Sequence, residues 1–225
     1  MNKHKYIKYN NYFKNHPNYG MSKQAVNNNI NWFYSQWQLI KNKIKITENM
    51  EVLEIGSGIG GFYHFLLKSK LNKYLGIELD LNAVKFSNNY FKTKKFRNSS
   101  LSNMNYKKKF DLIFAFEVLE HLENPLADII KINKLLKKNG TFCGSTPYPF
   151  DKNITSDKTH VFVLKPKNWE KLFLQSGFNE VKSYPMSFFP YLWRINKKFN
   201  VIIPFYIPFK YFVSTTLIIA KKNKT

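Results

Sequence analysis

The chain has 225 residues, of which 44% are hydrophobic, and this is enough to build the core of one globular domain with some appended structure. The composition therefore excludes a wholly disordered chain. The single cysteine, Cys143, and the absence of a long apolar run in the first residues exclude a disulfide-stabilised secreted protein and predict a reducing, cytoplasmic setting.

The formal net charge of +22 would favour a phosphate-rich partner such as nucleic acid. Nearly all of the positive charge belongs to lysine, however, because Arg97 and Arg194 are the only arginines. Bidentate recognition of phosphates and bases favours arginine. Asparagine is also abundant, as in residues 27–29, so a general enrichment of surface positions in Lys and Asn explains the charge better than a polyanionic partner does.

The first stretch, to about Lys45, is aromatic and polar and predicts a helical cap over residues 1–45. Its apolar residues recur at near-helical spacing. These residues are Trp32, Phe33, Trp37, Leu39, Ile40 and Ile44. The rest of the chain, residues 46–225, is predicted to form the main domain.

From Glu51 onward, short apolar runs alternate with amphipathic stretches, a pattern typical of strand–helix–strand units around a parallel sheet. The predicted strands span residues 52–55, 74–78, 95–97, 112–116, 141–144, 180–183 and 215–220. The predicted helices span residues 61–70, 81–91, 126–137 and a stretch from about Pro166 to Gly177. We therefore expect an α/β fold with a doubly wound, Rossmann-like sheet of seven strands.

The most informative motif is the sequence V-L-E-I-G-S-G-I-G-G of residues 52–61, in which an apolar strand leads into a glycine-rich turn and then a helix. Glycines let the backbone pass close to a ligand, and the amino terminus of the helix supplies N–H groups. The spacing matches Gly-x-Gly-x-Gly and, through Gly56, Gly58 and Gly61, also the dinucleotide fingerprint. The motif predicts a nucleotide-like ligand without naming it.

Two acids refine this prediction. Glu78 ends the next strand, about twenty residues after the first glycine, where an acid can accept hydrogen bonds from ribose hydroxyls. The alternative is an acid that merely faces water. Glu54 lies just before the glycine turn, where a carboxylate would disfavour a pyrophosphate but favour a cationic ligand such as S-adenosylmethionine, which carries an ammonium and a sulfonium group.

At this point the sequence resembles the class I S-adenosylmethionine-dependent methyltransferases. Residues 54–60 are similar to the first motif of that family, residues 74–80 to the second, residues 110–121 (F-D-L-I-F-A-F-E-V-L-E-H) to the fourth, and residues 135–147 to the segment that enters the fifth strand. The resemblance covers roughly residues 50–147. It implies the methyltransferase type of Rossmann-like sheet, S-adenosylmethionine as the cofactor, and methyl transfer as the reaction.

The resemblance also implies roles for individual residues. The glycine turn would wrap the methionine part of the cofactor with support from Glu54, Glu78 would hold the ribose, and Phe116 and Glu117 would face the sulfonium. The full set implied to surround the cofactor is Glu54, Gly56, Ser57, Gly58, Gly60, Glu78, Leu79, Ser100, Leu101, Phe116 and Glu117.

One position departs from the family pattern. The third motif usually carries an Asp near the adenine amino group, whereas the matching stretch, residues 96–101, offers Ser100. Either Ser100 or Asn98 makes a neutral hydrogen bond there, or apolar contacts with Leu79 and Leu101 hold the adenine.

Two histidines are candidate catalytic bases. His121 lies in E-V-L-E-H and His160 in D-K-T-H, and both segments resemble a subgroup that includes ubiquinone-pathway O-methyltransferases and many sugar- or antibiotic-tailoring methyltransferases. An imidazole that titrates near neutral pH can accept the proton of a substrate hydroxyl. The structural alternative is that His121 caps a helix and His160 anchors the loop before Pro166. With five histidines, one cysteine and no clustered ligand spacing, the sequence predicts no metal site.

Residues 148–214 are predicted to contain the substrate-side elements, including an aromatic insert over residues 188–213 that is edged with lysines. Such a mixture suits the headgroup boundary of a membrane. Pro204, Pro208 and Lys210 interrupt the insert, so it is a poor spanning helix. The two interpretations that remain are contact with the inner membrane surface and a soluble lid over the substrate pocket.

The predicted function is therefore methyl transfer to an oxygen of a small-molecule, sugar or lipid-linked acceptor. A nucleic-acid methyltransferase is the first alternative, but residues 116–121 lack the Asn/Asp-Pro-Pro-aromatic sequence of enzymes that methylate the amino groups of bases. A nicotinamide-dependent oxidoreductase has support only from the glycines. A non-catalytic cofactor-binding scaffold is the alternative from outside the enzymes.

Overall fold

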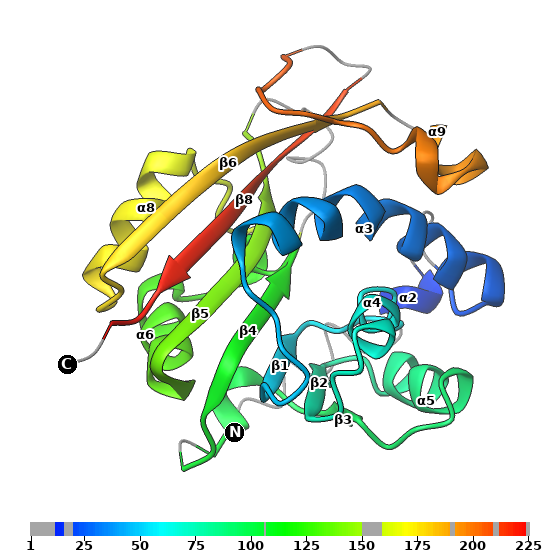
Figure 1. Ribbon diagram of the computed structural model, residues 1–225, viewed down its shortest axis with the longest axis horizontal. Coiled ribbons are helices and arrows are strands. Elements are labelled where there is room, and N and C mark those ends of the chain that lie inside the picture. Colours follow the sequence, from blue (N-terminus) through cyan, green and yellow to red (C-terminus); the bar gives the residue numbers. More distant parts are fainter. Residues whose placement is uncertain are drawn as a thin grey trace.

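A computed structural model describes residues 12–15, 20–105, 107–149, 159–189, 192–208 and 212–223 (Figure 1). Its strands are β1 (Val52–Ile55), β2 (Tyr74–Glu78), β3 (Phe96–Asn98), β4 (Phe110–Phe116), β5 (Leu136–Pro147), β6 (Glu180–Phe188), β7 (Ile202–Ile203) and β8 (Val213–Lys221). Its α-helices are α2 (Tyr12–Asn15), α3 (Lys23–Lys43), α4 (Tyr63–Lys68), α5 (Leu81–Tyr90), α6 (Pro125–Leu135), α8 (Pro166–Gln175) and α9 (Leu192–Ile195). Short 3-10 turns are η1 (Leu101–Asn103), η2 (Leu119–His121) and η3 (Lys197–Phe199).

All described strands join one eight-stranded sheet in the order β3-β2-β1-β4-β5-β8-β6-β7. The strands from β3 to β5 are parallel, whereas β8 pairs antiparallel with both β5 and β6. The strand order reverses between β1 and β4, and in open α/β sheets ligands bind at the carboxyl ends of the strands beside such a switch point. The topology therefore directs attention to the segments that follow β1, β2 and β4.

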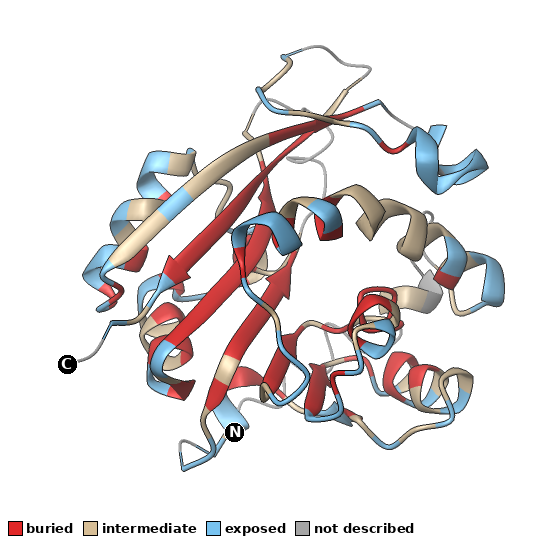
Figure 2. Cartoon of the chain, in the orientation of Figure 1, coloured by how far each residue is buried: buried red, intermediate tan, exposed pale blue. Residues whose placement is uncertain are grey.

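The central strands β1, β2, β4, β5 and β8 are mostly buried and are drawn red in Figure 2, whereas much of β6 is only partly buried. Alternate residues of β4 enter different cores: Phe114 packs in a cluster with α3 and α4, and Ile113 in a cluster with α6 and α8. Successive side chains of a strand point to opposite faces, so an almost continuous apolar run is what a strand covered on both sides requires.

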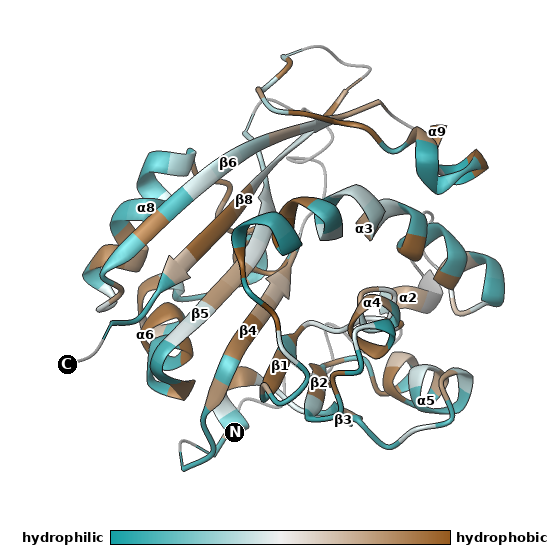
Figure 3. Cartoon of the chain, in the orientation of Figure 1, coloured by the Kyte–Doolittle hydropathy of each residue, from teal (hydrophilic) through white to brown (hydrophobic). Residues whose placement is uncertain are grey.

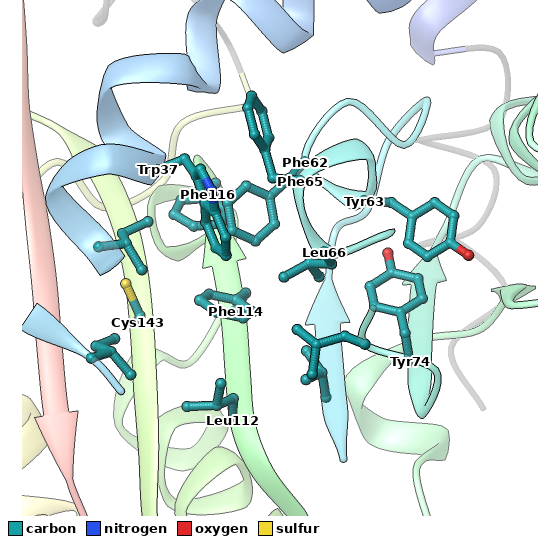
Figure 4. Packing of buried hydrophobic residues seen from close by; sticks show 14 of the residues in the cluster. Trp37, Phe62, Tyr63, Phe65, Leu66, Tyr74, Leu112, Phe114, Phe116 and Cys143 are labelled. Carbon is teal, nitrogen blue, oxygen red and sulfur yellow. The ribbon is translucent and has the colours of Figure 1, made fainter. Parts of the chain in front are cut away.

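Aromatic side chains join α3 to the sheet (Figure 4). The Trp37 ring lies 5.6 Å from the Phe62 ring, and Phe62 in turn lies 4.5 Å from Phe116 at the end of β4. The helix begins at Ser22, whose side chain accepts a hydrogen bond from the Ala25 N–H. Helix α3 therefore contributes to the core of the sheet and packs as part of the same body. The predicted division into a cap of residues 1–45 and a main domain of residues 46–225 stays a prediction.

The predicted α/β, Rossmann-like fold is confirmed, with differences at the ends of elements. β1 and β2 have the predicted limits, but β3 is shifted by one residue, α4 is shorter at both ends, and β5 and β6 are longer. The predicted helix over residues 126–137 ends at Leu135, because Leu136 already pairs with Phe110 of β4. The predicted seven strands become eight because Ile202 and Ile203 pair with the end of β6.

The aromatic insert forms α9, η3 and β7 beyond the end of β6. It is anchored to α3, because the Asn200 side-chain amide donates hydrogen bonds to the backbone carbonyls of Asn31 and Trp32. Lys210 and residues 1–11, which entered the sequence argument, lie outside the described residues. Within the described ranges, no helix combines the length and hydropathy needed to cross a membrane.

Candidate active site

The glycine-rich turn follows β1 at the switch point of the sheet. The N–H groups of Gly56 and Ser57 both donate to the carbonyl oxygen of Ile77 in β2, at 2.9 and 3.1 Å, which holds the turn against the neighbouring strand. Gly56, Gly58 and Gly60 all have positive φ, at +68°, +50° and +82°. L-residues with side chains rarely adopt this conformation, so the path of the turn depends on glycine.

The turn is also covered closely by other side chains. A Cβ atom at Gly56 would lie 2.4 Å from a methyl carbon of Val118, and one at Gly58 would lie 2.9 Å from the Phe13 ring. Phe13 belongs to α2, and its N–H donates to Asp80 at 3.2 Å. The segment before α3 therefore packs over the turn.

Glu78 connects the glycine turn to the start of α5. One carboxylate oxygen accepts a hydrogen bond from the Gly58 N–H at 2.9 Å, and the other accepts from the N–H groups of Leu79 and Asp80. Burial raises the pKa of Glu78, and these three N–H donors oppose that effect. A carboxylate has about four acceptor positions, so it retains capacity for a further donor such as a hydroxyl.

Glu54 is buried beneath the turn. Its carboxyl accepts a hydrogen bond from the Tyr74 hydroxyl at 2.5 Å, and burial raises its pKa to about 8. The side chain is therefore largely protonated at neutral pH. This places Glu54 where it can support the turn; its predicted contact with the ammonium group of a ligand stays a prediction.

Glu117 is the first residue after β4 and has a φ of +53°, which is uncommon for a residue with a side chain. Its N–H donates to the Ser145 carbonyl oxygen, and its carboxylate accepts hydrogen bonds from the hydroxyls of Ser145 and Thr215 at 2.6 and 3.2 Å. Residues of strands β5 and β8 thus hold this acid in place at the carboxyl end of β4. A half-buried acid with a strained backbone at such a position is typical of a functional site.

The two predicted histidines meet beside Glu117. The ring centroids of His121 and His160 are 4.8 Å apart at an angle of 62°, although the residues are far apart in sequence. Burial raises the pKa of Glu117 and hydrogen bonds from Ser145 and Thr215 lower it, with a smaller lowering effect from His160. The carboxyl end of β4 therefore gathers two imidazoles and an acid next to the glycine turn.

Comparison with models of protein families gives a match over most of the chain. Residues 36–183 match the model of a family described as a methyltransferase domain. The chain belongs to this methyltransferase family. The match covers the glycine turn, Glu78, the segment after β4 and His160.

A viral relative matches half of the chain. A protein of Invertebrate iridescent virus 6 that is named as a methyltransferase, 235L, is 23% identical over 114 residues, which are 50% of this chain and 43% of that protein. The chain thus spans less than half the length of this curated relative.

The structural likenesses show the methyltransferase fold. A SAM-dependent methyltransferase from Archaeoglobus fulgidus has a TM-score of 0.62 at 19% identity, covering 96% of this chain and 99% of that one. YcgJ from Bacillus subtilis has a TM-score of 0.66 at 13% identity, covering 85% and 100%. Phosphoethanolamine N-methyltransferase 2 from Haemonchus contortus, solved in complex with S-adenosyl-L-methionine, has a TM-score of 0.67 at 13% identity, covering 90% and 58%.

Hydrogen bonds around the end of β3 organise the segment that is predicted to lie near the adenine. The Asn98 side-chain amide donates to the carbonyl oxygens of Glu78 and Leu79, so its donors stabilise the turn after β2. The hydroxyl of Ser100 lies 2.7 Å from that of Ser102. The predicted contact of Ser100 or Asn98 with adenine stays a prediction. Leu101 is buried in the core on the α6 side, and the roles of Leu79 and Leu101 stay predictions.

Phe116 lies at the predicted end of β4, but its ring packs on Phe33 and Phe62. It forms an apolar wall continuous with α3. Its predicted contact with the sulfonium is not tested by these contacts.

Three contacts in this methyltransferase site could not be found from the motifs. Phe13 covers the glycine turn, Tyr74 bonds to Glu54, and Asp80 both caps α5 and holds Phe13. Of these residues, Asp80 carried a local signal, since an Asp directly before a helix is a preferred amino-terminal cap. The other two contacts join residues that are distant in sequence.

Proposed function

We propose that this methyltransferase domain transfers a methyl group from S-adenosylmethionine to an oxygen of a small-molecule, sugar or lipid-linked acceptor. This assigns it to the subgroup that is similar to ubiquinone-pathway and tailoring O-methyltransferases. The observation that carries the proposal is the pairing of His121 and His160 beside Glu117, at the end of β4 and next to the glycine turn.

The residues around the turn fit S-adenosylmethionine. The glycines remove side chains from the path of the methionine part, and Glu78 offers carboxylate oxygens at the end of β2 for the ribose hydroxyls. Glu54, largely neutral, supports the turn from below. When bound, the cofactor supplies an electrophilic methyl group, which the acceptor oxygen takes as the carbon–sulfur bond breaks and its electron pair returns to sulfur.

The chain's own residues contribute alignment and a proton acceptor. Holding the nucleophile in line with the methyl group lowers the barrier by proximity. An imidazole nitrogen of His121 or His160 takes the hydroxyl proton as the new oxygen–carbon bond forms. Phe116 and the neighbouring rings of α3 and α4 exclude water from one side of this space.

A methyl-transfer screen tests the proposal. Protein is incubated with methyl-labelled S-adenosylmethionine and lysate separated into lipid, glycan, nucleic-acid and small-molecule fractions. We expect label in a lipid, glycan or small-molecule fraction, with an alkali-stable ether linkage. His121→Ala and His160→Ala should lower turnover by about a hundredfold while leaving cofactor affinity nearly unchanged.

The matched control is His64→Ala, which removes a histidine on α4 whose ring packs on Phe65. Label confined to nucleic acid, or transfer to nitrogen only, would contradict the proposed acceptor. Wild-type turnover in both His121→Ala and His160→Ala would return these histidines to a structural role.

We further propose that the acceptor is presented at an anionic membrane surface, with the protein cytoplasmic and bound peripherally. Of eleven exposed large hydrophobic side chains among the described residues, six lie within residues 189–205: Phe189, Leu192, Ile195, Phe199, Val201 and Phe205. Figure 3 shows hydrophobic and hydrophilic segments interleaved there, and the exposed basic residues Arg194, Lys197 and Lys198 lie among them. This combination supports interfacial binding better than it supports a lid packed on the pocket, since a lid would bury its aromatics.

A further inference from the structure

Gln36 lies in the middle of α3, on the side that packs against the sheet. Its side chain is fully buried, yet neither the amide nitrogen nor the amide oxygen has a hydrogen-bond partner among the described residues. An unpaired buried amide lowers the stability of a fold, because its polar atoms have lost their hydrogen bonds to water. Such a residue at a core position of a helix is therefore expected to serve a purpose other than stability.

The neighbours of Gln36 on α3 place it beside the end of β4. Phe33 and Ile40 lie three positions before it and four positions after it, so the three residues share one face of the helix. The centroid of the Phe33 ring lies 5.2 Å from that of Phe116, the last residue of β4, and Figure 1 shows α3 lying across the sheet. Helical side chains lean toward the amino terminus, so the Gln36 amide is directed back toward Phe33 and this strand end.

Polar groups of the sheet lie on the same side. Ser145 of β5 is paired with Phe116 in the register of the sheet, and paired residues of neighbouring strands point to the same face. The Ser145 hydroxyl donates a hydrogen bond to the carboxylate of Glu117. Helix α3 and the carboxyl ends of β4 and β5 therefore bring an amide, aromatic rings and an acid to one side of the candidate active site.

The Phe33 ring controls access to the amide. Phe33 precedes Gln36 by about one turn and is only partly buried. Side chains with exposed surface change rotamer readily, so an outward rotation of this ring opens a path to Gln36. A flat group that takes the place of the ring would lie against Phe62 and Phe116, the rings that Phe33 contacts.

We infer that Gln36 recognises the methyl acceptor through an uncharged polar group that presents a hydrogen-bond donor beside an acceptor. A primary amide offers one acceptor oxygen and two N–H donors, so it pairs with such a group in both directions. A charged group would lose its hydration among the aromatic rings at high cost. The acceptor indicated is a ring-bearing molecule with a group such as a carboxamide. This inference rests on the proposed function, because it takes the ligand to be the methyl acceptor.

Replacement of Gln36 by methionine separates recognition from a structural role. Methionine has a similar length, fills irregular gaps and leaves no strong hydrogen-bonding group unpaired. We expect Gln36→Met to raise the melting temperature by at least about 3 °C, as measured by scanning calorimetry. Gln38→Met, at an exposed position of the same helix, is the matched control and should change it by less than about 2 °C.

A small probe tests binding without any methyl transfer. The full chain, isotope-labelled for NMR, is titrated with benzamide, which carries a ring and an uncharged amide, and the signals of the Gln36 side-chain amide and the Trp37 indole N–H are followed. We expect benzamide to shift both signals, and benzoate and toluene to bind at least about tenfold more weakly. Folded Gln36→Met should also bind benzamide at least about tenfold more weakly, whereas Gln38→Met should bind it as wild type does.

The outcomes distinguish this inference from the proposed function. No shift of the Gln36 signals with benzamide, equal affinity for benzoate, or equal benzamide binding by folded Gln36→Met would each overturn the inference. So would a lower melting temperature of Gln36→Met, because the amide would then hold the fold together through buried water. Gln36→Met should methylate the lysate fraction that wild type labels at least about tenfold more slowly, and an unchanged rate would also count against the inference. Benzamide binding at Gln36 without methyl transfer to any fraction would instead contradict the proposed function and leave Gln36 as a ligand-binding residue.

Discussion

Glu78 is the residue on which cofactor binding is expected to depend most. Its carboxylate connects Gly58 to the start of α5, and the family resemblance implies that it also holds the ribose. Glu78→Gln keeps the shape of the side chain but replaces an acceptor oxygen with a donor. We expect S-adenosylmethionine to bind at least about tenfold more weakly, as measured by titration calorimetry.

Glu48→Gln is the matched control, because it removes an exposed carboxylate. Circular dichroism should confirm that both variants are folded. If folded Glu78→Gln binds the cofactor as tightly as wild type does, Glu78 is not the ribose ligand. Binding of a nicotinamide dinucleotide in place of S-adenosylmethionine would contradict the choice of cofactor itself.

Glu54 predicts a dependence of stability on pH. Burial raises its pKa from 4.5 to about 8, so between these values the folded protein retains a proton that the unfolded chain releases. The unfolding free energy therefore falls as pH rises through this window, by at most about 1.4 kcal/mol per pH unit from this group. Glu54→Gln is neutral at every pH and still offers an oxygen to Tyr74.

Urea unfolding of wild type and Glu54→Gln at pH 5.5, 7 and 8.5 measures this contribution. The variant should lose less stability than wild type over the range. Some dependence will remain, because burial also raises the pKa values of Glu78 and Glu117. Parallel pH profiles for the two proteins would show that Glu54 does not hold a proton in the folded state.

At the residue scale, local motifs in the sequence predict where the candidate site lies. The contacts within it between residues far apart in sequence could not be predicted. The glycine turn and Glu78 were identified because a strand, a turn and a helix impose their spacing over a few residues. The contacts of Tyr74 with Glu54 and of Phe13 with Asp80 cross 20 and 67 positions, and no pattern within a short window encodes them. The meeting of His121 with His160 is of the same kind.

At the scale of elements, the packing of α3 is expected to contribute much of the stability of the sheet. Trp37 is 5% exposed and lies against Phe62 and Phe65. Trp37→Ala should lower the unfolding free energy by about 3–5 kcal/mol, because it creates a cavity in a close-packed core. Gln38→Ala, at an exposed position of the same helix, should change it little.

Urea unfolding measures both variants. Equal stability of Trp37→Ala and wild type would mean that α3 is not part of the cooperative unit, as expected of a separable cap over residues 1–45. A loss of cofactor binding without a loss of stability would instead indicate that α3 serves mainly to cover the site.

The limits of elements show what hydrophobic patterning can and cannot predict. β1 and β2 are short and mostly apolar, so their limits could be predicted from the sequence. β5 begins within L-K-K-N-G, where the composition favours a turn and Asn139 has a φ of +60°. Its pairing with β4 and β8 extends the strand there, and such pairing is a tertiary effect.

At the scale of the whole molecule, the net charge of +22 and the exposed apolar insert are expected to act together. Anionic lipid attracts each nearby basic residue by about 1 kcal/mol, and the apolar side chains add the free energy of burial at the interface. Charge alone would give binding that salt abolishes. The insert predicts binding that moderate salt weakens but does not remove.

Flotation with anionic and with neutral liposomes, at low and at moderate salt, measures this binding. Wild type should float with anionic vesicles. The double variant Ile195→Asp with Phe199→Asp should remain at the bottom, because it replaces two exposed apolar side chains, 74% and 51% exposed, with charges that anionic lipid repels. Leu174→Asp is the matched control, since Leu174 is 51% exposed on α8, outside the insert.

The three proteins separate the possible explanations. Flotation of the control but not of the double variant places the contact at the insert. Loss of flotation in both would indicate attraction by overall charge, because each substitution lowers the net charge wherever it lies. A wild type that stays at the bottom with anionic vesicles at low salt would contradict membrane binding, and the exposed side chains of residues 189–205 would then be assigned to a lid that closes over the acceptor.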